Sequence, residues 1–191
     1  MIYVIRHGQT DLNQSGLLQG RSNYPLNEEG ILQAEKAAAW FLENGITFDY
    51  VFAGPLFRAF ETGKIVSGRK PVTDERLTEM DYGPYEGADL KSPPPEILAF
   101  FRDFVNVPAP EGMEQLSEVT TRTGLFLKDI QDLQGNILIA THAIAMKGIL
   151  ENLDPSAKGR YWSEYIGNCA VYGAENNNGR IGIPVQLYTG K

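Results

Sequence analysis

The sequence predicts an α/β fold, in which helices cover both faces of a mainly parallel, doubly wound sheet in a three-layer α/β/α arrangement. Short, largely apolar segments at 1–5, 48–54 and 136–142 are typical of buried strands. Segments with helical periodicity alternate with them. No repeat, low-complexity tract or long linker divides the chain, so we expect a single domain over residues 1–191.

The N-terminal half contains two of these strands, and a helix follows each. After strand 1–5, Asn27 is a good N-cap because its side chain can accept a hydrogen bond from a free amide of the first turn. Gly45 is typical of the end of that helix. Strand 48–54 leads into a helix at 55–67, which the proline at its first position favours.

The C-terminal half continues the alternation. The expected elements are a weaker strand at 71–77, a short helix at 95–105, helices at 113–134 and 143–153, the strand at 136–142, and final strands at 169–175 and 183–189 joined by a turn at 176–179. Residues 81–112 are proline-rich and irregular, and we expect them to form a small cap.

Composition excludes several classes of function. The single cysteine, Cys169, rules out an intramolecular disulfide, and with two histidines the chain is a poor candidate for a structural zinc site. A net charge of −7 argues against sequence-independent nucleic-acid binding. No apolar run approaches the roughly 20 residues that span a bilayer, and the N-terminus lacks a signal-peptide pattern. We therefore expect a cytoplasmic protein, and the sequence leaves its oligomeric state open.

Both histidines follow predicted parallel strands. His7 comes directly after strand 1–5, and His142 ends strand 136–142. In a doubly wound sheet, ligands bind beyond the carboxyl ends of the strands. Together with Arg6, the two histidines are therefore expected to meet at one edge of the sheet.

Arg58 and Glu79 complete a set suited to phosphate chemistry. Arginine presents a planar fork that matches phosphate oxygens, and a neutral imidazole is a competent nucleophile towards phosphorus. Cationic donors stabilise the charge of a transferred phosphoryl group, and a carboxylic acid can protonate the departing oxygen. The combination predicts a local phosphate site on an acidic protein.

Each of these residues also has a simpler interpretation. A lone histidine after a strand is more often structural. Arg58 could form a surface pair with Glu61 on the same helix. Glu79 has two acidic neighbours, Asp81 and Glu86, that compete for the role of acid. The phosphate prediction therefore depends on the combination.

Five segments in order resemble the histidine phosphatase superfamily, also called the phosphoglycerate mutase-like family. The opening RHGQT with Asn13 resembles the family pattern RHGxTxxN. The resemblance continues through LLQGRSNYPLNEEGILQA, GPLFRAFET, RLTEMDYGPYEG and ILIATHA, with a weaker match at GMEQLSEV. These segments span nearly the whole chain.

The resemblance implies a role for each candidate residue. His7 would attack phosphorus and become phosphohistidine. Glu79 would protonate the leaving oxygen and then deprotonate the attacking water. The phosphoryl oxygens would be held by Arg6, Asn13, Arg58 and His142. No metal and no organic cofactor is implied, and the partner would be a small phosphorylated substrate.

Within the family, the sequence favours a phosphatase. Only 62 residues separate Glu79 from His142, which leaves room for a modest cap. A mutase must protect its intermediate from water, so a small cap favours hydrolysis. The alternatives are a phosphoglycerate mutase-type phosphotransferase and a non-catalytic phospholigand-binding protein of the same fold.

Specificity is less well defined by the sequence. The cap concentrates aromatic residues that could line the pocket or could simply anchor the cap, namely Tyr82, Tyr85, Phe100, Phe101 and Phe104. Lys147 and Arg160 could contact substrate, although we favour a surface position for both. The chain departs from the family pattern at Asn23, Gly54, Gln115 and Ala143.

Overall fold

The computed structural model describes residues 1–177 and 180–190. A six-stranded sheet in the order β3-β2-β4-β1-β5-β8 forms its centre. The strands are β1 (Ile2–Arg6), β2 (Tyr50–Ala53), β3 (Val72–Thr73), β4 (Ile137–Thr141), β5 (Val171–Ala174) and β8 (Val185–Tyr188). The pairs from β3 to β1 are parallel, whereas β5 and β8 pair antiparallel. The predicted α/β fold with a mainly parallel sheet is confirmed.

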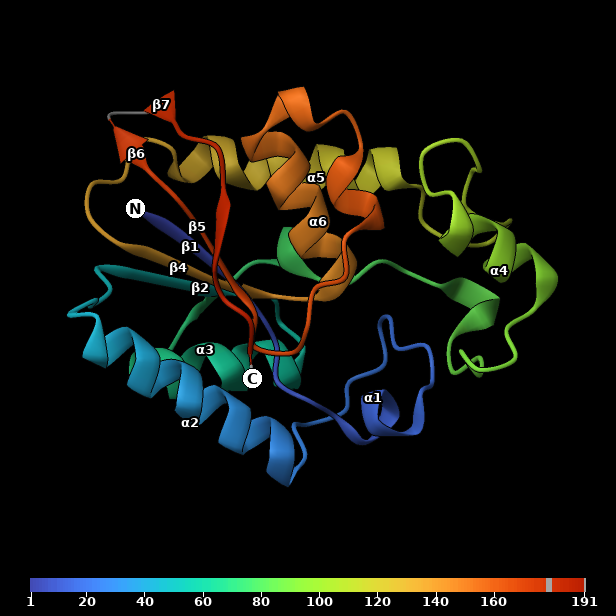
Figure 1. Ribbon diagram of the computed structural model, residues 1–191, viewed down its shortest axis with the longest axis horizontal. Coiled ribbons are helices and arrows are strands. Elements are labelled where there is room, and N and C mark those ends of the chain that lie inside the picture. The colour runs from blue at the N-terminus through green and yellow to red at the C-terminus, as the bar shows by residue number, and fades with distance from the viewer. Residues whose placement is uncertain (178–179, 191) are drawn as a thin grey trace.

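Helices cover both faces of this sheet (Figure 1). One face carries α2 (Glu28–Glu43) and α3 (Phe57–Ser67), and the other carries α5 (Leu116–Ile130) and α6 (Ala143–Leu153). Side chains of β1 alternate between two cores: Tyr3 and Ile5 pack on the α2 and α3 side, and Ile2 and Val4 pack on the α5 and α6 side. A strand that is buried on both faces needs apolar residues at every position. The run from Ile2 to Ile5 meets this need and contributes side chains to both cores.

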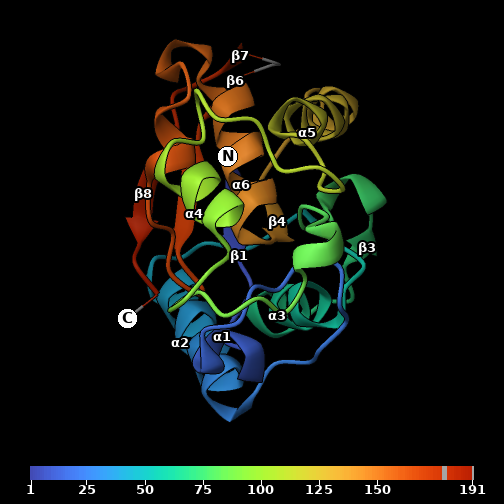
Figure 2. The same cartoon turned by 90° about the vertical axis from the view of Figure 1, so that its right-hand side faces the viewer.

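The predicted cap lies beyond the carboxyl ends of the parallel strands. It contains η2 (Gly83–Tyr85) and α4 (Pro95–Arg102), and Figure 2 shows α4 facing the viewer beside α6. Phe100 and Ile97 of α4 are fully buried in a third apolar cluster with Met80 and Ile144. The cap is therefore packed onto the start of α6.

Several predicted boundaries are wrong. The strand expected at 71–77 is reduced to β3, because Asp74 caps the short 3₁₀ helix η1 (Glu75–Leu77) by accepting the amide of Arg76. The helix expected at 113–134 begins only at Leu116, after a capping box made by Gln115 and Glu118, and it ends at Ile130. The helix expected at 95–105 ends at Arg102.

Short elements escaped the sequence analysis. They are α1 (Asp11–Ser15), η3 (Pro155–Ala157), η4 (Arg160–Ser163), and the antiparallel pair β6 (Asn176–Asn177) and β7 (Arg180–Ile181). Elements this short show no measurable periodicity. The turn predicted at 176–179 includes residues 178 and 179, which lie outside the described residues. None of the helices described is long and apolar enough to cross a membrane.

Candidate active site

The two histidines lie side by side at the carboxyl ends of β1 and β4. Arg6 pairs with Thr141 across these neighbouring strands, and the amide of His7 donates a hydrogen bond of 2.9 Å to the Thr141 carbonyl. The rings of His7 and His142 follow, with centroids 5.2 Å apart and planes inclined by 59°. The sheet therefore brings together two residues that are 135 positions apart (142 − 7).

The loop after β1 passes very close to the start of α2. A Cβ on Gly8 would overlap the carbonyl of Gly30, and a Cβ on Gly30 would overlap the carbonyl of Gln9. Glycine is needed here for this close approach of two backbones. The Gly8 amide also donates to Thr62 Oγ1 at 3.0 Å, which ties the loop to α3.

Hydrogen bonding selects the tautomer of His7. Its Nδ1 lies 2.7 Å from the carbonyl oxygen of Gly8. A carbonyl can only accept, so Nδ1 carries the hydrogen and Nε2 keeps its lone pair. Burial, followed by the charges of Arg58 and Arg6, holds the pKa of His7 well below its usual range. His7 is therefore a neutral imidazole with a free Nε2, as a nucleophile requires.

Arg58 is fully buried, so the surface pair with Glu61 is wrong. Its guanidinium donates to the carbonyls of Ser22 and Gly20 at 2.7 and 2.6 Å. Burial lowers the pKa of Arg58 to about 10, an effect that the carboxylate of Glu79 opposes. The group remains a cation at neutral pH.

The three neighbouring acidic residues have different roles. Glu86 accepts the amides of residues 20–22 and so supports the loop whose carbonyls hold Arg58. Asp81 accepts the amide of Gly83 in the cap. Glu79 alone among them lines the cavity described below.

Glu79 is anchored at the N-terminus of α6. Its Oε1 accepts the amides of Met80, Ile144 and Ala145 at 2.9, 3.1 and 3.1 Å. Its Oε2 shares only the Ile144 amide, at 3.2 Å. These amides belong largely to the first turn of the helix, where N–H groups have no intrahelical partner. Oε2 is therefore the oxygen that remains available for proton transfer.

His142 is fully buried at the N-cap of α6. Its environment includes Gly54, where the family pattern has serine. A Cβ on Gly54 would lie 2.7 Å from the Leu77 carbonyl and 3.0 Å from Nε2 of His142. Burial, then the charges of Arg58 and His7, holds the pKa of His142 well below its usual range. Its ring is therefore neutral.

Buried polar atoms without partners gather at this site. Among the described residues, the buried side-chain polar atoms with no hydrogen-bond partner are Arg6 Nε, Gln19 Nε2, Arg58 Nε, His142 Nδ1 and His142 Nε2. Each unmade bond costs about 1–3 kcal/mol, so such atoms are rare unless a ligand satisfies them. Four of these five atoms belong to residues predicted to hold phosphate.

A cavity of about 330 Å³ opens beside these groups. Arg6, His7, Asn13 and Glu79 line it, whereas Arg58 and His142 do not and are fully buried. Asn13 caps α1 together with Thr10, and its Nδ2 donates only a long bond of 3.5 Å to Gln19. Its Nδ2 therefore has donor capacity left for an anion. No cluster suited to a metal ion occurs within residues 1–177 and 180–190.

The cap aromatics divide between the two expected roles. Phe100 is fully buried and packs against the tilted ring of Phe101 and edge-on against Phe104, so it anchors the cap. Phe101, Phe104 and Tyr82 line the cavity. Tyr85 does not line it and donates instead to Glu96 on α4.

The surface position expected for Lys147 is wrong. Its side chain is buried, lines the cavity and donates to the Trp162 carbonyl at 2.7 Å. Burial lowers the pKa of Lys147 to about 8. A sequence signal existed, because Lys147 is the only charged residue in the first two turns of a helix whose other polar residues, Glu151 and Asn152, lie near its end. Arg160 lies at the surface, as expected, beside Asp154.

The sequence model of the histidine phosphatase superfamily (branch 1) matches residues 2–185. The chain belongs to the histidine phosphatase superfamily. It is 30% identical over 178 residues to a protein of Hydrogenobacter thermophilus named "Putative phosphoserine phosphatase 2", covering 89% of this chain and 86% of that one. It is 32% identical over 161 residues to the Yersinia pestis protein "Probable phosphoglycerate mutase GpmB", covering 80% and 74%.

Solved structures of the superfamily share the fold. A phosphoserine phosphatase variant from Entamoeba histolytica, in complex with phosphoserine, superimposes with a TM-score of 0.82 at 23% identity, covering 98% of this chain and 95% of that one. The fold is therefore shared with that structure over nearly the whole chain.

Acid is expected to destabilise this histidine phosphatase below about pH 6.5. The folded pKa values of His7 and His142 are depressed, so below their unfolded value of about 6.5 the unfolded chain binds protons that the folded chain does not. Each histidine then lowers the free energy of unfolding by up to about 1.4 kcal/mol per pH unit. Urea unfolding at pH 7, 6 and 5.5 measures this slope.

The control for this measurement is the His142→Gln variant, which lacks one of the two groups and should show a smaller slope. An unchanged free energy of unfolding between pH 7 and 5.5 in the original protein would contradict the buried neutral state of both rings.

Proposed function

We propose that this protein is a phosphomonoester phosphatase that acts through a phosphohistidine intermediate on His7, with Glu79 as the general acid and base. The observation that supports this most strongly is the set of unpartnered buried donors of Arg6, Arg58 and His142 around a nucleophilic imidazole. A phosphoryl group is the ligand whose oxygens would accept from the two arginines and from the one N–H of the neutral His142 ring.

The reaction has two steps. In the first, Nε2 of His7 attacks phosphorus, the bond from phosphorus to the ester oxygen breaks, and Oε2 of Glu79 gives its proton to that oxygen. In the second, Glu79 takes a proton from water, the water oxygen attacks phosphorus, and the bond from phosphorus to nitrogen breaks. In both steps the equatorial oxygens are held by Arg6, Asn13, Arg58 and His142.

The size of the cavity supports a small phosphorylated metabolite as substrate. At about 330 Å³ it lies at the small end of ligand pockets, and apolar side chains form much of its wall. The relatives named above include enzymes named for phosphoserine and for phosphoglycerate, both of which are small phosphate esters. A cytoplasmic location remains a prediction.

A phosphoglycerate mutase activity is the second candidate, favoured by the likeness to the Yersinia protein of that name. The two activities differ in what accepts the phosphoryl group. We expect the phosphoenzyme, formed with ³²P-labelled substrate, to be labile in acid, to carry its label on His7, and to release it as inorganic phosphate.

The label is chased with and without unlabelled 3-phosphoglycerate, because water and that acceptor compete for it. Release of inorganic phosphate at the same rate in both cases supports the phosphatase. Label that appears in bisphosphoglycerate supports the mutase. If no phosphoenzyme forms although vanadate binds, the non-catalytic phospholigand-binding protein is the better description.

A further inference from the structure

The cavity contains a second cation that the proposed chemistry does not use. Its lining includes two cationic side chains, Arg6 and Lys147. Arg6 belongs to the phosphate-binding set. Lys147 is only 8% exposed and makes no ion pair among the described residues. A buried ammonium group without a counter-ion is costly, which indicates a position built for an anion.

Lys147 lies beside the general acid. The Ile144 amide holds Glu79, and Lys147 follows Ile144 by three residues, on the same face of α6. Side chains on a helix lean towards its N-terminus, which brings Nζ towards Glu79. The leaving oxygen must lie within hydrogen-bonding distance of Glu79. The first atoms of the leaving group therefore lie next to Lys147.

The protein's own contacts use only part of this ammonium group. Nζ donates one bond, to the Trp162 carbonyl, and lies 5.1 Å from the centroid of the Phe104 ring. An ammonium group has three donors, so two remain for a ligand.

The charges that face Lys147 are those of Arg6, Glu79 and Glu164. Glu164 is already engaged, because it pairs with Arg160 at 3.6 Å and accepts the hydroxyl of Tyr172 at 3.1 Å. Glu79 is held by the amides at the start of α6. The positive charge of Lys147 therefore remains without a carboxylate of the protein in hydrogen-bonding contact.

We propose that Lys147 is the specificity-determining residue of the leaving-group pocket and binds a carboxylate there. The preferred substrates are then phosphate esters of small hydroxy acids, hydroxy amino acids included. A single lysine matches the single charge of a carboxylate, whereas a second phosphate dianion would call for further arginine forks. Among the described residues, Arg6 is the one arginine that lines the cavity, and it belongs to the set that holds the first phosphate. This proposal rests on the proposed phosphatase function.

Matched substrates measure the preference directly. Phosphoserine and phosphoethanolamine differ only by a carboxylate, and 3-phosphoglycerate and glycerol 3-phosphate differ by the exchange of a carboxylate for a hydroxymethyl group. Within each pair we take the ratio of kcat/KM. Lys147→Met should lower this ratio by about 10- to 100-fold, as expected for the loss of a hydrogen bond to a charged group. Lys147→Arg should retain a preference for the carboxylate.

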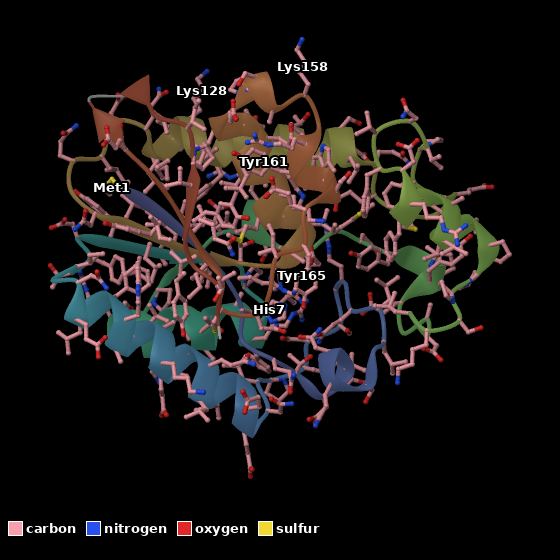
Figure 3. The ribbon with its side chains drawn as sticks, in the orientation of Figure 1. Met1, His7, Lys128, Lys158, Tyr161 and Tyr165 are labelled. Atoms are coloured by element: carbon pink, nitrogen blue, oxygen red, sulfur yellow. The ribbon has the colours of Figure 1, made fainter. Side chains whose placement is uncertain are left out.

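Lys128→Met is the matched control, because it makes the same exchange at an exposed position far from His7 (Figure 3). It should leave the ratio unchanged. Each ratio compares kcat/KM for two substrates of the same variant. If the role of Lys147 were purely structural, its substitution would lower kcat/KM for both substrates together and leave the ratio unchanged. That outcome would overturn the proposal.

Binding of non-hydrolysable phosphonates separates this inference from the proposed function. Calorimetry compares 2-amino-4-phosphonobutyrate with 3-aminopropylphosphonate, which lacks only the carboxylate. Tighter binding of the first compound, lost in Lys147→Met, supports the carboxylate site even if no substrate is hydrolysed. Equal binding by the original protein would refute the site, while hydrolysis of both substrate pairs would leave the phosphatase function standing.

Discussion

The His7→Ala variant is expected to lose hydrolysis of a generic aryl phosphate by at least about 10,000-fold, the scale seen when a covalent nucleophile is removed. His7 is the histidine that lines the cavity, and its Nδ1 contact with the Gly8 carbonyl leaves Nε2 with a free lone pair. Water would have to attack phosphorus directly, without the covalent intermediate. The steady-state rate at which the phenol is released measures the loss of activity.

Free imidazole provides the control for this variant. The truncated side chain leaves room beside Gly8, and added imidazole can attack phosphorus there in place of His7. Partial recovery of activity would show that the remaining donors are still in place and that a nucleophile alone is missing. Undiminished hydrolysis by His7→Ala without imidazole would exclude the mechanism.

The Glu79→Gln variant is expected to separate the two steps. Glutamine cannot give a proton to the leaving oxygen, so alkyl phosphates should react about 100- to 10,000-fold more slowly. A 4-nitrophenyl ester needs no such proton. It should still phosphorylate His7 and release a burst of one nitrophenol per active site, followed by slow turnover, because Glu79 no longer activates water. Rapid-mixing absorbance measures the burst.

Asp81→Asn is the matched control for Glu79→Gln. Asp81 lies two residues further along the chain, and its Oδ1 accepts the Gly83 amide, a bond that asparagine can keep. It does not line the cavity. Its variant should hydrolyse alkyl phosphates at the rate of the original protein. If Asp81→Asn were the slow variant and Glu79→Gln the active one, the acid would be wrongly assigned.

The sequence predicted the sheet well where strands are buried on both faces. The segments at 1–5, 48–54 and 136–142 match β1, β2 and β4 to within one or two residues, because largely apolar segments have few alternatives to a central strand. The prediction of a strand over 71–77 was wrong because that segment is charged. Asp74 accepts the amide of Arg76 and pairs with its guanidinium, so a 3₁₀ helix begins after the two residues of β3.

The candidate site likewise contains residues that the sequence predicted and a choice whose physical reason lies in the tertiary structure. The sequence alone named the two histidines and Arg58, because ordered motifs and strand ends limit where such residues can lie. It named Glu79 through the family resemblance, whereas residue type alone left Asp81 and Glu86 as competitors. That choice depends on which carboxylate meets the free amides at the start of α6, a contact between segments 65 residues apart in the chain (144 − 79).

What the sequence determined by itself is therefore the order of the elements and the chemical types of the site residues, since both follow from local pattern. Tertiary structure alone decided which side chains are buried without partners. For Lys147 the only local signal was its apolar helix, and its burial became clear only from the cap and the segment at 160–166, which cover it. Burial by distant segments is the physical quantity that no local pattern contains.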